Sequence, residues 1–209
     1  MALTKEQIKE FKATEKEAED SDGYRSLADE IAESGDKEWA KKIYGKAEEK
    51  GENCYEFIYL ADSIFENLGD KNLSIGLYKK AEQKAEDISE FIDLADRIHE
   101  NLGDTDWTKK VYEKAEEKAD EFSEFRNLAN IIYKNLCDIE WANKIFNKAP
   151  LTNEESKKFT KAEKKAKDYQ ELRDVAHKIS EAGDKKWAKN VLKKAEEQSS
   201  DYSGFTSVA

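Results

Sequence analysis

Apolar and small residues recur along the chain in one order, with a period of roughly 34 residues. Each copy centres on a leucine, with an aromatic residue or leucine three positions before it. An alanine follows directly and an isoleucine comes four positions after it. The central position is taken by Leu27, Leu60, Leu94, Leu128 and, after a longer gap, Val175. Because positions i, i+3, i+4 and i+7 form one stripe on an α-helix, the pattern predicts five copies of a first helix, helix A.

A short turn follows each helix A, with the sequences SGD, LGD, LGD, LCD and AGD. Glycine just past a helix end adopts the left-handed conformation that satisfies the last carbonyls, and aspartate caps the next helix. Cys137 replaces glycine in the fourth turn, which predicts a more strained or differently shaped turn there.

The turn leads into a second helix, helix B, which carries Trp39, Leu73, Trp107, Trp141 and Trp187 in its first turn. All four tryptophans of the protein occupy this one position. Recurrence in step favours packing between helices over stacking on a ligand. Each hairpin of helices A and B has an apolar face that it cannot bury alone, so the copies are expected to stack.

The regular spacing breaks between Ala149 and Val175. Pro150 is expected to end the fourth helix B, because proline lacks the amide and clashes with the preceding turn. The next helix starts with a capping box of Thr152 and Glu155, and the N-terminus has the same box in Thr4 and Gln7. Residues 3–50 and 151–198 align without a gap. Each segment therefore predicts a lone second helix followed by a hairpin.

Residues 24–49, YRSLADEIAESGDKEWAKKIYGKAEE, carry the series in order and resemble a tetratricopeptide repeat. The resemblance covers about residues 5–198. It implies an all-α fold, a right-handed α-α superhelix (TPR-like solenoid) of about five hairpins plus a leading helix and one inserted helix. The whole chain, 1–209, is expected to form a single solenoid. Its parts are a leading helix with four hairpins (1–150), an inserted helix with the fifth hairpin (151–198), and a tail that resembles a truncated next helix (199–209).

Charge and composition exclude several classes. The net charge is −11, and residues 1–100 hold the acidic excess, which disfavours nucleic acid because phosphate binding needs a basic face. No apolar run reaches membrane-spanning length and the N-terminus lacks the apolar core of a signal peptide, so a soluble cytoplasmic protein is expected. Cys54 and Cys137 are interpreted as two half-buried thiols in a reducing compartment.

Catalytic or metal-binding motifs are not found. The two histidines, His99 and His177, have no metal-ligand spacing, and the sequence contains no GxGxxG, phosphate-binding loop or GxSxG. The many acids and bases spaced four apart are interpreted as solvated helix faces. The sequence therefore predicts a protein that is not an enzyme and has no cofactor or metal.

The resemblance implies that helix A lines a concave binding face. Carrying the family's positions over gives these candidate binding residues: Arg25, Asp29, Ile58, Asp62, Phe65, Ile92, Asp96, His99, Arg126, Asn130, Tyr133, Arg173 and His177. Phe65, His99 and Tyr133 form a row of rings, and Ile58 and Ile92 are apolar at a step where a solvated face would be polar. The alternative is that this row packs between helices A and B.

The expected function is a non-catalytic scaffold for protein–protein interaction. It would bind a peptide or helix of a partner, one with basic and apolar side chains, on the concave helix-A face. The chain is also interpreted as a fragment of a longer repeat protein. The rival hypothesis is a structural repeat protein that stacks end to end into dimers or filaments.

Overall fold

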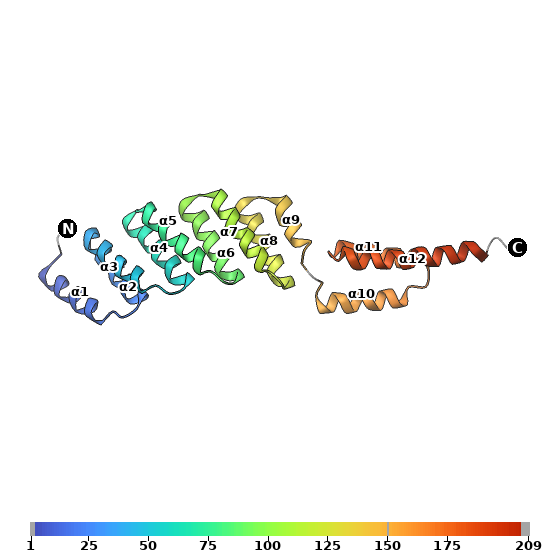
Figure 1. The fold of residues 1–209 in the computed structure, drawn as a ribbon, viewed down its shortest axis with the longest axis horizontal. Helices are drawn as coiled ribbons and strands as arrows, with labels where there is room; N and C mark the ends of the chain where they lie inside the picture. Colours follow the sequence, from blue (N-terminus) through green and yellow to red (C-terminus); the bar gives the residue numbers. More distant parts are fainter. Residues whose placement is uncertain (1–2, 150, 206–209) are drawn as a thin grey trace. The chain divides into compact units, whose positions relative to one another are not determined.

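The structure is a computed structural model that describes residues 3–149 and 151–205, with side chains as far as Glu197. All the regular structure in these residues is helical (Figure 1). The chain forms two compact units, residues 1–118 and 119–209. The boundary between the two units lies at the end of the third hairpin. Because each repeat contacts only its neighbours, an array can divide at any such boundary.

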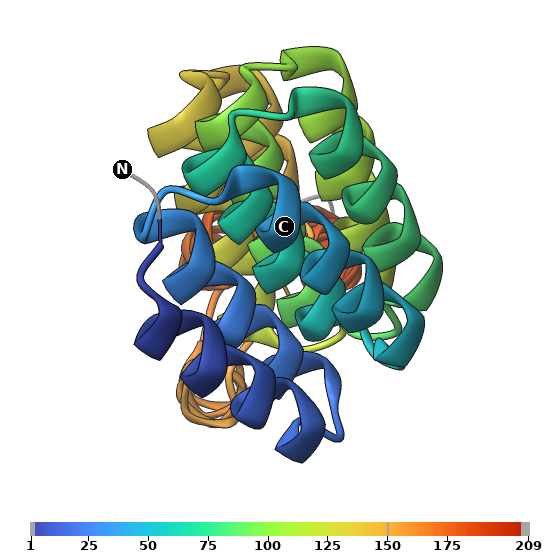
Figure 2. The same cartoon turned by 90° about the vertical axis from the view of Figure 1, so that its left-hand side faces the viewer.

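The first unit contains a leading helix and three hairpins. Its helices are α1 (Lys5–Glu17), α2 (Ser21–Glu33), α3 (Lys37–Lys50), α4 (Cys54–Leu68), α5 (Lys71–Lys84), α6 (Ile88–Arg97), the π-helical turn η1 (Ile98–Leu102) and α7 (Thr105–Lys118). Helices α2 and α3, α4 and α5, and α6 and α7 pack as pairs, and α4 and α6 each pack on the preceding pair. Figure 2 looks onto the α1, α2 and α3 side of this unit.

The second unit contains α8 (Phe122–Leu136), α9 (Ile139–Phe146), α10 (Asn153–Lys165), α11 (Tyr169–Glu181) and α12 (Lys185–Phe205). Helices α8 and α9 form a hairpin, and α11 packs against both α10 and α12. The twelve α-helices of the described residues match the predicted order of leading helix, four hairpins, inserted helix and last hairpin. The helix break expected at Pro150 lies outside the described residues.

The predicted tail differs from the structure. Helix α12 continues without interruption to Phe205, so a separate helix does not begin after Ser199. The last residues of the tail, 206–209, lie outside the described residues. Asp201 resembles the cap of a helix A in sequence, but uninterrupted helical hydrogen bonding continues through this position.

The turns follow the sequence prediction. Gly35, Gly69, Gly103 and Gly183 all have positive φ, and the aspartate after each turn begins helix B. In every helix B, a carboxylate oxygen accepts from the backbone amide three residues on, as Asp36 does from Trp39 at 3.0 Å and Asp184 from Trp187 at 2.8 Å. Cys137 adopts the same left-handed conformation, with φ of 53°, and is the one non-glycine residue described that does so.

The predicted lone helices also agree with the structure. Thr4 and Thr152 both form the expected capping boxes. Phe11 of α1 packs edge-on against Trp39 with ring centroids 5.9 Å apart, and Phe159 of α10 packs the same way against Trp187 at 6.3 Å. Both segments therefore form the same three-helix arrangement, and these two tryptophans pack between helices as predicted.

Candidate functional site

The seams between hairpins in the first unit are held by a repeated set of three polar residues, which we call the Asp–Tyr–Asn lock. Tyr44 of α3 donates to Asp29 of α2 at 2.5 Å, and Asn67 of α4 donates to the same Asp29 oxygen at 2.9 Å. The Asn67 amide also lies 3.0 Å from the Tyr44 hydroxyl oxygen. One residue from each of three helices therefore meets at one point.

The next seam repeats this lock. Tyr78 of α5 donates to Asp62 of α4 at 2.5 Å, and Asn101 of η1 donates to Asp62 at 2.9 Å and to the Tyr78 oxygen at 2.7 Å. Tyr112 of α7 likewise donates to Asp96 of α6. Because both tyrosine rings of the first two seams are almost completely buried, the lock lies at the bottom of the seam.

Burial changes the acidity of these groups. Desolvation is the largest cause that raises the pKa of Asp62, opposed by the hydrogen bond from Tyr78 and by the charge of Arg97, whose Nε lies 3.3 Å from the carboxylate. Desolvation and the acceptor carboxylates also raise the pKa of Tyr44 and Tyr78 far above that of a free phenol. The tyrosines therefore remain protonated donors at neutral pH.

A second repeated feature links four pairs of helices: α1 with α3, α3 with α5, α5 with α7, and α10 with α12. A glutamate on one helix accepts from a lysine on the next: Lys46 pairs with Glu15 at 2.6 Å, Lys80 with Glu48 at 2.8 Å, Lys114 with Glu82 at 2.9 Å, and Lys194 with Glu163. Two of these glutamates also accept a hydrogen bond from a tryptophan: the Trp107 indole donates to Glu82 and the Trp187 indole donates to Glu163. Charges that were interpreted as solvated faces thus connect repeats.

The predicted concave-face residues lie mostly in the seams. Ile58 and Ile92 were expected on the binding face, but they are only 1 % and 7 % exposed and belong to the core. Asp29, Asp62 and Asp96 accept from the tyrosines described above. Arg25 is half-buried and pairs with Asp22 and Asp29, and Phe65 lies beneath the Lys71 ammonium at 5.9 Å. His99 is half-buried. These side chains serve mainly contacts between helices.

The remaining candidates, from the fourth and fifth hairpins, are exposed. Asn130 and Tyr133 line a groove of about 350 Å³ between α8 and α9, and Arg126 stacks over the Phe146 ring at 4.5 Å. Arg173 and His177 line a groove of about 530 Å³ between α11 and α12. In both hairpins the grooves involve the same repeat positions. The structure thus separates the thirteen candidates into seam residues and groove residues.

The solvent-exposed side of helix A lies one position away from the predicted row. Tyr59 of α4 is 45 % exposed and stacks on Tyr55 with ring centroids 6.1 Å apart. Glu33, Glu66 and Glu100 recur at one repeat position and are all exposed, as is Asp93 of α6. We call Tyr59, Glu33, Glu66, Asp93 and Glu100 the helix-A face. The family positions carried over from the resemblance also include Glu33, Glu66 and Glu100, whereas the sequence pattern did not single out Tyr59 or Asp93.

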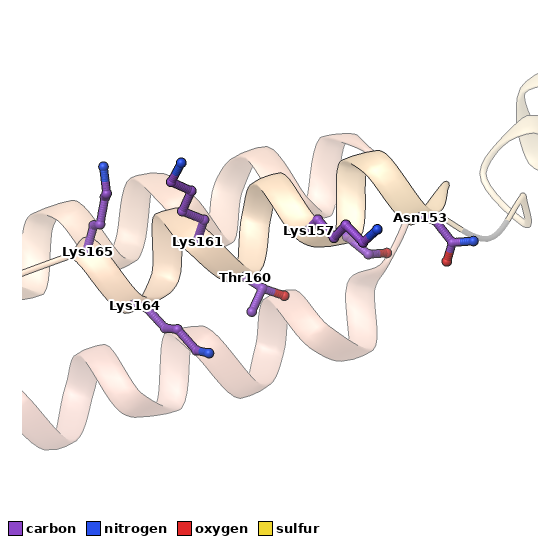
Figure 3. Close-up of a pocket in the computed structure, with 7 residues that line it drawn as sticks. Asn153, Lys157, Thr160, Lys161, Lys164 and Lys165 are labelled. Carbon is purple, nitrogen blue, oxygen red and sulfur yellow. The ribbon is translucent and has the colours of Figure 1, made fainter.

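Helix α10 of the second unit carries a lysine-rich surface (Figure 3). The open space beside it measures about 490 Å³ and is lined by residues of this one helix: Asn153, Ser156, Lys157, Thr160, Lys161, Lys164 and Lys165. Lys161 occupies the repeat position of the seam-spanning lysines such as Lys46. Among the described residues, these four lysines have no carboxylate within ion-pair distance, so the surface is basic in an otherwise acidic protein.

The described residues contain neither a candidate metal site nor a candidate membrane span. Within the described residues, no group of three or more His, Cys, Asp or Glu side chains is placed to hold a metal ion. None of the described helices is long and apolar enough to cross a membrane. Comparisons of the chain with protein-family models, with curated proteins and with solved structures give no match.

Proposed function

We propose that the protein is a non-catalytic scaffold of TPR-like helical repeats, wound as a right-handed superhelix, that binds a peptide or helix of a partner protein. The supporting observation is the exposed stack of Tyr59 on Tyr55 within the helix-A face. Tyr55 is half-buried and faces Ser89 of α6, whereas the Tyr59 ring is 45 % exposed. A large exposed ring is suited to contact with a cation or an aliphatic side chain.

The charge of this face defines the partner. Glu33, Glu66, Asp93 and Glu100 are exposed and make this face negative. The Arg97 guanidinium pairs with Asp62 and Glu100. A partner segment with lysine or arginine next to leucine-like residues is complementary to this surface. A nucleic acid does not complement this negative surface, because its phosphates carry the same sign of charge, and the proposed function requires no cofactor.

The proposal is tested with the full chain and a synthetic amphipathic peptide of lysine and leucine. Replacing Tyr59 with Ala together with Glu66 and Glu100 with Lys is expected to weaken binding by about tenfold at low salt, because both the ring and the charge are lost. Lys157→Glu with Lys161→Glu on α10 is the control and should not weaken binding. Equal affinity of wild type and the triple variant would remove the helix-A face from consideration.

A second candidate function, self-assembly through stacked hairpins, is favoured by Leu192. This side chain of α12 is 41 % exposed although its equivalents, Tyr44 and Tyr78, are 1 % and 0 % exposed. Stacking of another hairpin would cover it. Sedimentation of wild type and Leu192→Glu distinguishes the two functions, since a strictly monomeric wild type excludes self-assembly.

A further inference from the structure

The α8–α9 hairpin exposes a surface that its counterparts in the first unit cover. The positions of Ala129, Ala142 and Phe146 correspond to Ala28, Ala40 and Tyr44 in α2–α3. There, α4 packs on the hairpin and leaves these three residues at most 1 % exposed. In the α8–α9 hairpin Ala129 and Ala142 stay buried, at 3 % and 8 % exposed, whereas Phe146 is 38 % exposed and Tyr133 is 56 % exposed. In the first unit the equivalent surface is covered by a helix A, so a helix has a shape that fits it.

The chemistry of the α8–α9 groove differs from that of the seams. Asn130 stands where the seams have Asp29 and Asp62, and Phe146 stands where they have Tyr44 and Tyr78. The residues that line the groove are uncharged, with Ile139 57 % exposed at its edge. The Arg126 guanidinium lies over the Phe146 ring at 4.5 Å. Both polar members of the lock on this side are therefore absent. An incoming asparagine such as Asn67 would lose its carboxylate acceptor and its hydroxyl contact.

The chain's own next helix A is already packed elsewhere. Leu172, Ala176 and Ile179 of α11 are buried in a core with Ala188, Val191 and Ala195 of α12, and Phe159 of α10 packs against this core. In this structure α11 packs against α10 and α12 and does not pack on the α8–α9 hairpin in the way that α4 packs on α2–α3.

We propose that the α8–α9 groove docks an amphipathic α-helix of a partner protein, placed as α4 is on α2–α3, with an apolar side chain where α4 carries Asn67. This interface continues the stacking geometry of the seams but replaces their polar lock with an apolar contact. It goes beyond the scaffold function proposed above, because it uses a different surface and does not depend on binding at the helix-A face.

The test uses two synthetic peptides with the sequence of α4, held helical by a staple on the solvent side. One peptide keeps Asn67 and the other has Asn67→Leu; both have Cys54→Ser. The full chain is expected to bind the Asn67→Leu peptide about tenfold more tightly, because the asparagine would be buried without its partners. Phe146→Asp should abolish binding, whereas Leu192→Asp at the equivalent position of α12 should leave it unchanged.

A second variant tests which of the two peptides the groove prefers, and it keeps side chains of similar size. Asn130→Asp with Phe146→Tyr restores the lock residues and is expected to reverse the preference toward the Asn67 peptide. An unchanged preference, or binding that survives Phe146→Asp, would overturn the proposal. Sedimentation covers the other occupant: a wild-type dimer that Phe146→Asp converts to a monomer would assign the groove to a second copy and also overturn it. Loss of peptide binding at Tyr59 would affect only the scaffold proposal.

Discussion

The Tyr78 hydroxyl donates to Asp62 at 2.5 Å, and both groups also contact the amide of Asn101 from the following hairpin. This relationship connects three helices through one buried carboxylate. Since Asp29, Tyr44 and Asn67 repeat the arrangement one hairpin earlier, the lock fixes how consecutive hairpins are aligned. A purely apolar seam would permit sliding that these directional bonds prevent.

Removal of one hydroxyl should therefore destabilise the first unit. Tyr78→Phe keeps the ring but leaves Asp62 and Asn101 without their shared partner, so we expect the free energy of unfolding to fall by about 1–2 kcal/mol. Urea denaturation followed by circular dichroism measures this. Tyr59→Phe, on the exposed side of α4, is the control and should change stability by less than about 0.5 kcal/mol.

Acid should affect Asp62 and Asp70 in opposite directions. Burial raises the pKa of Asp62 above its ordinary value of 3.8. At a pH between 3.8 and the higher folded pKa, the Asp62 carboxyl is protonated in the folded protein but ionised in the unfolded chain. Its contribution to stability is therefore fully present below pH 3.8 and is lost as the pH rises through the folded pKa. We expect wild type to gain stability relative to Asp62→Asn as the pH falls from about 7 to about 4.

Asp70 is the matched control for this titration. The hydrogen bond with Lys41, at 2.9 Å, is the largest cause that lowers the pKa of Asp70 below 3.8. Its contribution is present above that value and is lost as the pH falls through the lower folded pKa. Wild type should therefore lose stability relative to Asp70→Asn in strong acid. If the two difference curves run in the same direction, Asp62 is not desolvated in the folded protein.

The two cysteines should differ in reactivity. Cys54 is buried, and desolvation followed by the charges of Glu90, Asp87 and Asp93 raises its pKa to about 12, whereas Cys137 is exposed. At mildly alkaline pH, a disulfide reagent should modify Cys137 rapidly and Cys54 only when the first unit opens. The Cys137→Ser variant isolates the slow phase. Rapid modification of both thiols in the native protein would contradict the packing of α4.

Cys137 should lower the stability of the protein, because it occupies a turn position that favours glycine. A non-glycine residue with φ of 53° carries a conformational cost, so Cys137→Gly is expected to raise the free energy of unfolding by about 1 kcal/mol. Gly69→Ala is the converse: a Cβ there would meet no atom within 4 Å, so its cost of about 1 kcal/mol comes from the backbone alone. Thermal unfolding of both variants measures the difference. A destabilising Cys137→Gly would show that the side chain contributes a contact.

Local signals in the sequence determined much of the fold. The helix order, the glycine turns, the aspartate caps and the two capping boxes all depend on residues within one helix or turn of each other. The packing of Trp39 and Trp187 against α1 and α10 also followed from the sequence, because the same residue recurs at the same position. The period of Lys46, Lys80 and Lys114 was equally visible, but sequence spacing alone did not reveal their partners on the preceding helix.

The sequence by itself determined that the chain is a set of helical hairpins, because helical period, capping and turn chemistry act over a few residues. Tertiary structure alone decided which side of each helix A meets solvent. That choice depends on where the neighbouring hairpin lies. Its packing buries Ile58 and Asp62 of α4 in seams and leaves Tyr59 of α4 exposed. Contacts between residues about 34 positions apart fix this direction, and no local pattern contains it.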